Sequence, residues 1–111
     1  MLKQQIKRRH NIYVIELDKS VLTNKKFINA NPEYKDGKPC VYVGLTGRSP
    51  EERFMQHKAG YKSSNIARRY GIRLKPRQFE AFNPMTYDEA CDMEKEKTRR
   101  LRNKGWGVWS N

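Results

Sequence analysis

The longest helix that the sequence predicts, at residues 87–103, carries a carboxylate in a position where carboxylates are uncommon. At about 100° per residue, Tyr87, Cys91 and Leu101 form one apolar stripe, and Glu94 falls near its middle. A carboxylate on a buried stripe is unfavourable unless it is paired with a cation or binds one. Glu94 is therefore either a metal ligand or one half of a structural ion pair with an arginine that faces the core.

Arg53 and His57 form a second pair of chemical interest. They stand four positions apart on a predicted helix, so their side chains project from the same side, beside Phe54. The pair places a permanent cation next to a proton carrier. The same spacing also occurs on ordinary solvated helix faces, and strand tyrosines such as Tyr13 and Tyr42 are most often core residues. None of these residues establishes catalysis alone.

Two familiar catalytic patterns are excluded. Gly44 and Gly47 lie between a predicted strand and a predicted helix, but only two residues separate them and an arginine follows in place of the lysine. The segment is therefore not a phosphate loop of the Walker type. Apart from His10 the sequence contains only His57, and its residue order provides no serine or cysteine triad.

Two strands are expected to hold the tyrosines. Residues 11–17 are rich in β-branched and aromatic side chains, and residues 40–46 form a similar apolar run. Because side chains alternate along a strand, Tyr13 lies on one face of the first strand, and Tyr42 and Gly44 share one face of the second.

Capping residues mark the predicted helices. Ser49, Pro50 and Glu52 give an N-cap, a first-turn proline and a capping-box acid, so a helix should begin there and stop at Gly60. A capping box that opens at Thr86 starts the long helix that carries Glu94. Between them we expect a short basic helix at 65–70 and a third strand at about 78–82.

The composition indicates one small domain with a polyanionic partner. The chain has 111 residues, with 24 Lys and Arg against 12 Asp and Glu, which gives a formal charge of +12. Such a charge favours nucleic acid over a merely soluble surface. Residues 1–10 predict a basic arm and residues 18–39 a turn-rich insertion. No apolar run is long enough for a membrane span, and Cys40 and Cys91 lack zinc or disulfide spacing, which favours an intracellular, cytoplasmic location.

In their order along the chain, these residues resemble the GIY-YIG nuclease family. Asn11-Ile12-Tyr13 and Tyr42-Val43-Gly44 match the two strand motifs, Arg53 and His57 match the helix that follows, and Glu94 matches a late glutamate. Asn11 departs from the family's first glycine and Val43 from its isoleucine, and the spacer between the tyrosines is longer than usual. The resemblance covers residues 11–111.

The resemblance implies an α+β domain in which helices flank a small three-stranded antiparallel sheet. It also implies a metal-dependent DNA endonuclease, with Tyr13 as the general base and Glu94 as the ligand of Mg²⁺ or Mn²⁺. Arg53 would stabilise charge on the phosphate, and Tyr42 and His57 would orient these groups. Asn111 would match the family's late asparagine.

The expected partner is DNA, either double-stranded or structured, with no membrane partner and no small-molecule cofactor. Four cations after the arginine helix would bind the phosphate backbone: Lys58, Lys62, Arg68 and Arg69. The alternative is a catalytically inactive nucleic-acid-binding module on the same fold, with RNA as one ligand it could take.

Overall fold

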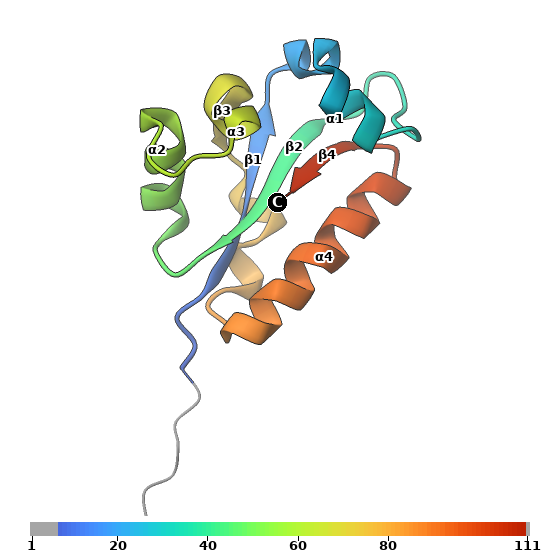
Figure 1. The fold of residues 1–111 in the computed structure, drawn as a ribbon. Coiled ribbons are helices and arrows are strands. Elements are labelled where there is room, and N and C mark those ends of the chain that lie inside the picture. Colours follow the sequence, from blue (N-terminus) through green and yellow to red (C-terminus); the bar gives the residue numbers. More distant parts are fainter. Residues whose placement is uncertain (1–6, 111) are drawn as a thin grey trace, which may run out of the picture.

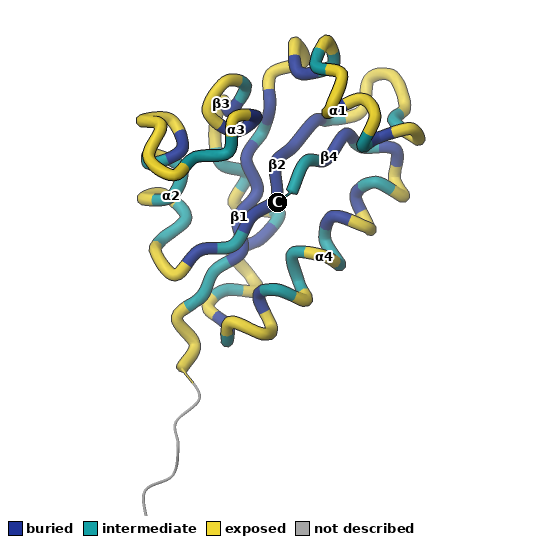
Figure 2. The backbone as a smooth tube through the Cα atoms, viewed as in Figure 1, coloured by how far each residue is buried: buried dark blue, intermediate teal, exposed yellow. Residues whose placement is uncertain are grey.

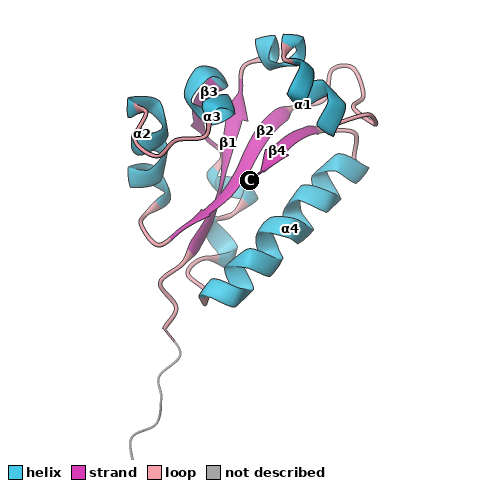
Figure 3. Ribbon diagram, viewed as in Figure 1, coloured by secondary structure: helices cyan, strands magenta, loops and turns pink. Residues whose placement is uncertain are grey.

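The computed structural model describes residues 7–110 of the chain, and within them a four-stranded sheet flanked by helices (Figures 1 and 3). The strands are β1 (Asn11–Leu17), β2 (Cys40–Thr46), β3 (Gly71–Leu74) and β4 (Gly107–Ser110). The α-helices are α1 (Lys25–Ala30), α2 (Pro50–Ala59), α3 (Asn65–Tyr70) and α4 (Tyr87–Asn103). Three short 3₁₀ helices occupy Lys19–Thr23, Pro76–Gln78 and Glu80–Phe82.

The sheet is mixed, in the order β3-β1-β2-β4. β1 pairs antiparallel with β2 and with β3, whereas β4 pairs parallel with β2. The α+β class is confirmed, but the expected three-stranded, wholly antiparallel sheet is wrong. In Figure 1, α2 and α3 lie on the β1–β3 side of the domain and α4 lies on the β2–β4 side. None of the helices in residues 7–110 has the length and apolar character needed to cross a membrane.

The third strand lies at β3 and not at the expected residues 78–82. That segment is split between two 3₁₀ helices, because Phe79 is buried while Phe82 is 44% exposed. The edge of β1 beyond β3 is filled by the side chain of Asn83, which donates to the carbonyl of Ile12 at 2.8 Å and accepts from its amide at 2.9 Å. An amide side chain therefore replaces a strand at this edge.

The helix boundaries follow the capping residues. Ser49 Oγ accepts from the amide of Glu52 at 3.1 Å at the start of α2, and Gly60 ends that helix with φ of 84°. At the start of α4, Thr86 and Glu89 exchange both bonds of the expected capping box. These local signals were sufficient to predict both helices.

The predicted insertion at 18–39 builds the far edge of the sheet. Phe27 of α1 is fully buried, and Asn31 Oδ1 accepts from the amide of Val108 at 2.8 Å and from Arg102 Nε at 3.1 Å. Arg102 Nη2 in turn donates to the carbonyl of Val108 at 2.8 Å. The insertion and the end of α4 thus fix β4 through its backbone.

Burial is concentrated on the two central strands, which are dark blue along most of their length in Figure 2.

Within the expected basic arm, residues 1–6 lie outside the described part. His10 already belongs to the fold, because it pairs with Met85 through two backbone hydrogen bonds of 3.0 and 2.8 Å. The folded domain therefore begins at His10 within the described chain.

We expect Asn31→Ala to lower the free energy of unfolding by roughly 2–4 kcal/mol, because it leaves the buried Val108 amide and the Nε of Arg102 without their acceptor. Urea unfolding measures this change. Asn29→Ala, on the exposed side of the same helix, should change stability by no more than about 0.5 kcal/mol. Equal effects of the two variants would contradict the role given to Asn31.

Candidate active site

The pairing of β1 with β2 brings the two tyrosines together. Tyr13 lies opposite Gly44, and Ile15 lies opposite Tyr42, so the tyrosines are diagonal neighbours on one face of the sheet. Their ring centroids are 6.0 Å apart, and both side chains are almost fully buried. The expectation that Tyr13 and Tyr42 lie side by side on antiparallel strands is confirmed.

Gly44 is required by this arrangement. A Cβ atom at position 44 would lie 2.5 Å from both Cζ and Oη of Tyr13, which is far inside van der Waals contact. The Tyr13 ring therefore occupies the space that a side chain on β2 would need. The glycine fixes where the Tyr13 hydroxyl lies.

α2 supplies a histidine to the tyrosine pair. His57 is fully buried, and its Nε2 lies 2.8 Å from Tyr13 Oη. Its ring centroid is 5.9 Å from that of Tyr13 and 5.3 Å from that of Tyr42. The three rings form one polar cluster inside the domain, which we call the tyrosine–histidine cluster.

The direction of the Tyr13–His57 hydrogen bond follows from a backbone contact. The amide of Ser64 donates to His57 Nδ1 at 3.1 Å, so this nitrogen carries no proton. Burial, with a smaller contribution from the positive charge of Arg53, lowers the pKa of His57 to about 4, so the ring is neutral at pH 7. Its one proton is therefore on Nε2 and is donated to Tyr13.

Both tyrosine pKa values are raised by burial. For Tyr13 burial is the largest cause, Tyr42 raises the value further, and Arg53 opposes them. Hydrogen bonding between the two side chains acts in opposite directions on them, since it raises the pKa of Tyr13 and lowers that of Tyr42. Burial outweighs the opposing effect of Arg53, and His57 is neutral, so the protein's own groups leave the pKa of Tyr13 above its usual value.

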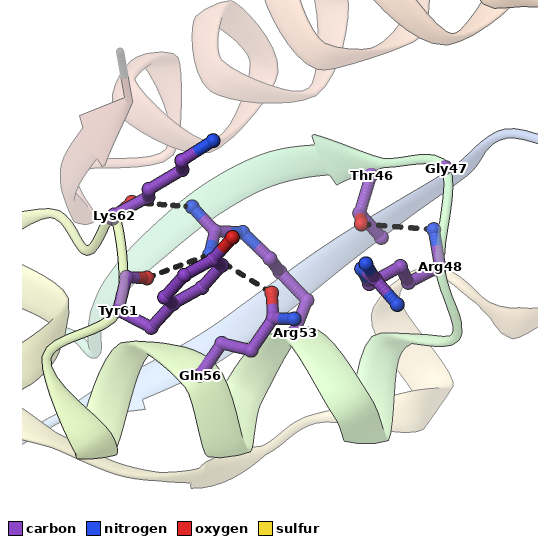
Figure 4. A pocket seen from close by; sticks show the side chains of 7 residues that line it. All are labelled: Thr46, Gly47, Arg48, Arg53, Gln56, Tyr61 and Lys62. Carbon is purple, nitrogen blue, oxygen red and sulfur yellow. Dashed lines mark hydrogen bonds between the residues drawn. The ribbon is translucent and has the colours of Figure 1, made fainter.

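Arg53 is held by the loop that follows α2 (Figure 4). Its Nη2 donates to the carbonyl of Lys62 at 2.8 Å, and its Nη1 donates to the carbonyl of Tyr61 at 3.3 Å and to Gln56 Oε1 at 3.2 Å. Lys62 has φ of 44°, in the left-handed region. This conformation forms part of the turn that presents both carbonyls to the guanidinium.

Glu94 of α4 belongs to the same site. Burial is the main cause of the raised pKa of Tyr42, and the negative charge of Glu94 adds to it, so Glu94 acts on the cluster electrostatically. Burial raises the pKa of Glu94 itself, and Lys95 partly opposes this shift. The carboxylate makes no ion pair with any residue in 7–110, so the alternative of a structural ion pair has no partner there.

The apolar stripe that suggested Glu94 is only partly as expected. Leu101 is buried and Cys91 is half-buried, but Tyr87 is 56% exposed. Tyr87 stands in the first turn of α4, where its ring lies edge-on to His10 at 5.2 Å and outside the core. The buried face of the helix is formed instead by Ala90, Thr98 and Leu101.

The donor set suits a hard cation in part. A carboxylate oxygen is a ligand that Mg²⁺ and Mn²⁺ prefer, and Glu94 offers one beside the cluster. Within residues 7–110 there is no group of three or more His, Cys, Asp and Glu side chains that would enclose a metal. A cation on Glu94 would therefore take most of its ligands from water and from substrate oxygens.

The four cations expected on the phosphate backbone differ in their surroundings. Lys58 Nζ donates to the carbonyls of Arg68 and Gly71, each at 2.8 Å, so its charge caps the end of α3. Arg68 donates to Asn65 at 3.2 Å, and Arg69 lies over the Tyr70 ring at 5.2 Å. Lys62 is exposed beside Arg53, which makes it the best placed of the four.

Sequence reasoning missed a hollow of about 520 Å³ beside Arg53 (Figure 4). Arg48, Gln56 and Tyr61 line it together with Lys62. The signal in the sequence was present: Arg48 directly precedes the N-cap of α2, and Tyr61 directly follows its glycine stop. Asn111, the expected match to the late asparagine, lies outside the described residues.

No family model, curated protein or solved structure matches the chain. The resemblance to GIY-YIG nucleases therefore rests on the motif residues themselves: Tyr13, Tyr42, Arg53, His57 and Glu94. The chemistry open to these residues follows from their positions and charges.

The tautomer of His57 provides a test that needs no activity. Ser64 has φ of −68°, which proline can adopt, so Ser64→Pro removes the amide hydrogen that fixes Nδ1. We expect wild-type protein to show the Nε2–H form in ¹H–¹⁵N correlation spectra of the imidazole. Ser64→Pro should lose this form and its bond to Tyr13, because the proline ring carbon takes the place of the amide hydrogen and displaces the imidazole.

Ser64→Ala is the matched control, because it also loses the hydroxyl that caps α3 but keeps the amide hydrogen. It should retain the wild-type tautomer. An Nε2–H ring in Ser64→Pro would mean that the backbone amide does not set the proton position.

Proposed function

We propose that this protein is a divalent-metal-dependent endonuclease that hydrolyses phosphodiester bonds in DNA, of the GIY-YIG type. The observation that carries the proposal is the 2.8 Å hydrogen bond between Tyr13 and His57 in a buried cluster with Tyr42. Arg53 and Glu94 both act electrostatically on Tyr42 of this cluster. The formal charge of +12 favours a nucleic acid as the substrate.

The charge distribution supports hydrolysis over binding alone. A protein that only binds a phosphate backbone has no need of a carboxylate that acts on its buried tyrosines, because a carboxylate repels phosphate. Glu94 lies within reach of the cluster although burial makes its ionised form less favourable. This arrangement is reasonable where a cation neutralises the carboxylate during the reaction.

In the proposed reaction a water oxygen attacks phosphorus, and the bond to the leaving oxygen breaks. Tyr13, in its ionised form, takes the proton of the attacking water. His57 holds the Tyr13 oxygen through its Nε2–H, and the Tyr42 ring lies beside the Tyr13 ring in the resting site. Arg53 stabilises the negative charge that develops on the phosphate oxygens.

Glu94 would hold Mg²⁺ or Mn²⁺, which when bound supplies positive charge at the phosphate and at the leaving oxygen. This positive charge is needed because the protein's own groups do not ionise Tyr13 at neutral pH. Burial keeps Tyr13 protonated at neutral pH, and Arg53 alone does not reverse that effect. A catalytically inactive module on the same fold, for DNA or for RNA, is the outcome if the following experiments fail.

Glu94→Gln is expected to reduce nicking of supercoiled plasmid in Mg²⁺ by at least about 100-fold, because the isosteric amide cannot balance the cation. DNA binding should be unchanged or slightly tighter, because a negative charge has left the phosphate site. Asp92→Asn, an exposed carboxylate two positions away on α4, is the control and should keep wild-type rates. Cleavage by Glu94→Gln at the wild-type rate would rule out Glu94 as the ligand.

Tyr13→Phe tests the general base through pH. Because the pKa of Tyr13 is raised and the base is the ionised form, the single-turnover rate of wild-type protein should climb with pH, about tenfold per unit below that pKa. Tyr13→Phe should lose roughly 10²- to 10⁴-fold in rate, and its rate should not increase with pH in this way. Tyr34→Phe is the control, because the Tyr34 hydroxyl donates to the Lys38 carbonyl at 2.7 Å in the insertion, away from the cluster. It should keep the wild-type rate and the wild-type increase with pH. A wild-type rate that does not change with pH would place the base elsewhere.

A further inference from the structure

The hollow beside Arg53 has positively charged and polar walls. Arg48 and Lys62 are exposed at its rim, and Gln56 of α2 contributes an amide (Figure 4). Arg48 forms an ion pair with Glu52 at 3.6 Å, but both side chains are more than half exposed, so the pair contributes little stability. The Arg48 guanidinium is therefore free to exchange this partner for an anion.

Tyr61 presents an aromatic ring to the hollow. Its side chain is 53% exposed, while its backbone is held at both ends. Its amide donates to the carbonyl of Gln56 at 2.9 Å, and its carbonyl accepts from Arg53 at 3.3 Å. The Nζ of Lys62 lies 5.6 Å from the ring centroid. An exposed ring on a fixed backbone next to cations is the arrangement that stacks a nucleobase.

The size of the hollow selects among nucleic-acid ligands. A volume of about 520 Å³ lies within the range of small-ligand sites, about 300–1,000 Å³, so one nucleotide fits inside the hollow, whereas a duplex could only lie across its opening. Opposite Tyr61, the turn at Thr46 and Gly47 closes the hollow. This turn is fixed because the Arg48 amide donates to Thr46 Oγ1 at 3.0 Å and its carbonyl accepts from Asn11 at 2.9 Å.

We infer that this hollow binds one unpaired nucleotide of the DNA strand that Arg53 holds, with the base stacked on Tyr61 and the phosphate bound by Arg48 and Lys62. The inference rests on the proposed function, because it takes the scissile phosphate to lie at Arg53. It names a substrate class: DNA with an unpaired nucleotide next to the cleaved bond, as in a bulge, a flap or a loop. Specificity then comes from DNA structure and not from base sequence.

The test measures binding without metal, so that it is independent of cleavage. The probe is a DNA duplex with a single bulged 2-aminopurine, compared with the fully paired duplex of the same sequence. Wild-type protein should quench the fluorescence of the bulged 2-aminopurine and bind the bulged DNA more tightly. Tyr61→Leu should lose the quenching and weaken binding to the bulged DNA by about tenfold, with little change for the paired duplex.

Three variants complete the design. Phe82→Leu is the matched control, because Phe82 is also an exposed ring with a lysine near it, Lys97 Nζ at 5.8 Å from its centroid, on a different surface. It should behave as wild type. Tyr61→Phe keeps the ring and should retain the quenching. Arg48→Gln should weaken binding and lower the slope of log affinity against log salt by about one.

Equal binding of bulged and paired DNA by wild-type protein would overturn the inference. Retained quenching of 2-aminopurine by the Tyr61→Leu variant would also overturn it. The outcomes also separate the two proposals. Loss of quenching in Tyr61→Leu, in a protein that never cleaves DNA, would support the nucleotide site and refute the nuclease. Cleavage of bulged and paired DNA at the same rate by both wild-type protein and Tyr61→Leu would support the nuclease and refute the nucleotide site.

Discussion

The antiparallel register of β1 and β2 is the constraint on which the site depends, because it sets Tyr13 opposite Gly44. A slip of one residue would move Tyr13 to the other face of the sheet and away from His57. A side chain at position 44 would occupy the place of the Tyr13 ring. The tyrosine pair and its hydrogen bond to α2 therefore follow from one choice of register and one glycine, both fixed within the two most buried strands.

The loop that joins α2 to α3 controls the rest of the site. Gly60 ends α2 in the left-handed region, and Lys62 adopts the same region two residues later. The loop carbonyls hold the Arg53 guanidinium, and the amide of Ser64 at its end holds His57 Nδ1. One short segment thus sets both the direction of the cation and the position of the imidazole proton. The side chain of Lys62 and the ring of Tyr61 are exposed on the same segment. A nucleic acid that contacts them therefore acts on the backbone that holds Arg53 and His57.

The sequence predicted the features that depend on local pattern and missed those that depend on distant partners. Strand alternation located Tyr13 and Tyr42, and capping residues located α2 and α4. β4 has only four residues, and its backbone is fixed by Asn31 and Arg102, which no local pattern connects to it. The third strand was placed too late because aromatic residues at 79 and 82 resemble a strand, although the edge of β1 at that point is filled by a side-chain amide. The raised pKa of Tyr13 could not be predicted from the sequence, because burial cannot be measured from residue types.

Burial disfavours negative charge in the resting site, and this has a consequence for the order of binding. Tyr13 and Tyr42 are held protonated, His57 is neutral, and the carboxylate of Glu94 is less acidic than in water. A phosphate that approaches alone adds negative charge and raises the pKa of Tyr13 further, which opposes ionisation of the proposed base. A cation at Glu94 would lower the pKa of both tyrosines and of the carboxylate, and it would keep His57 neutral. In the proposed enzyme, therefore, DNA without metal forms an inactive complex, and the ionised tyrosine becomes accessible only when cation and phosphate are present together.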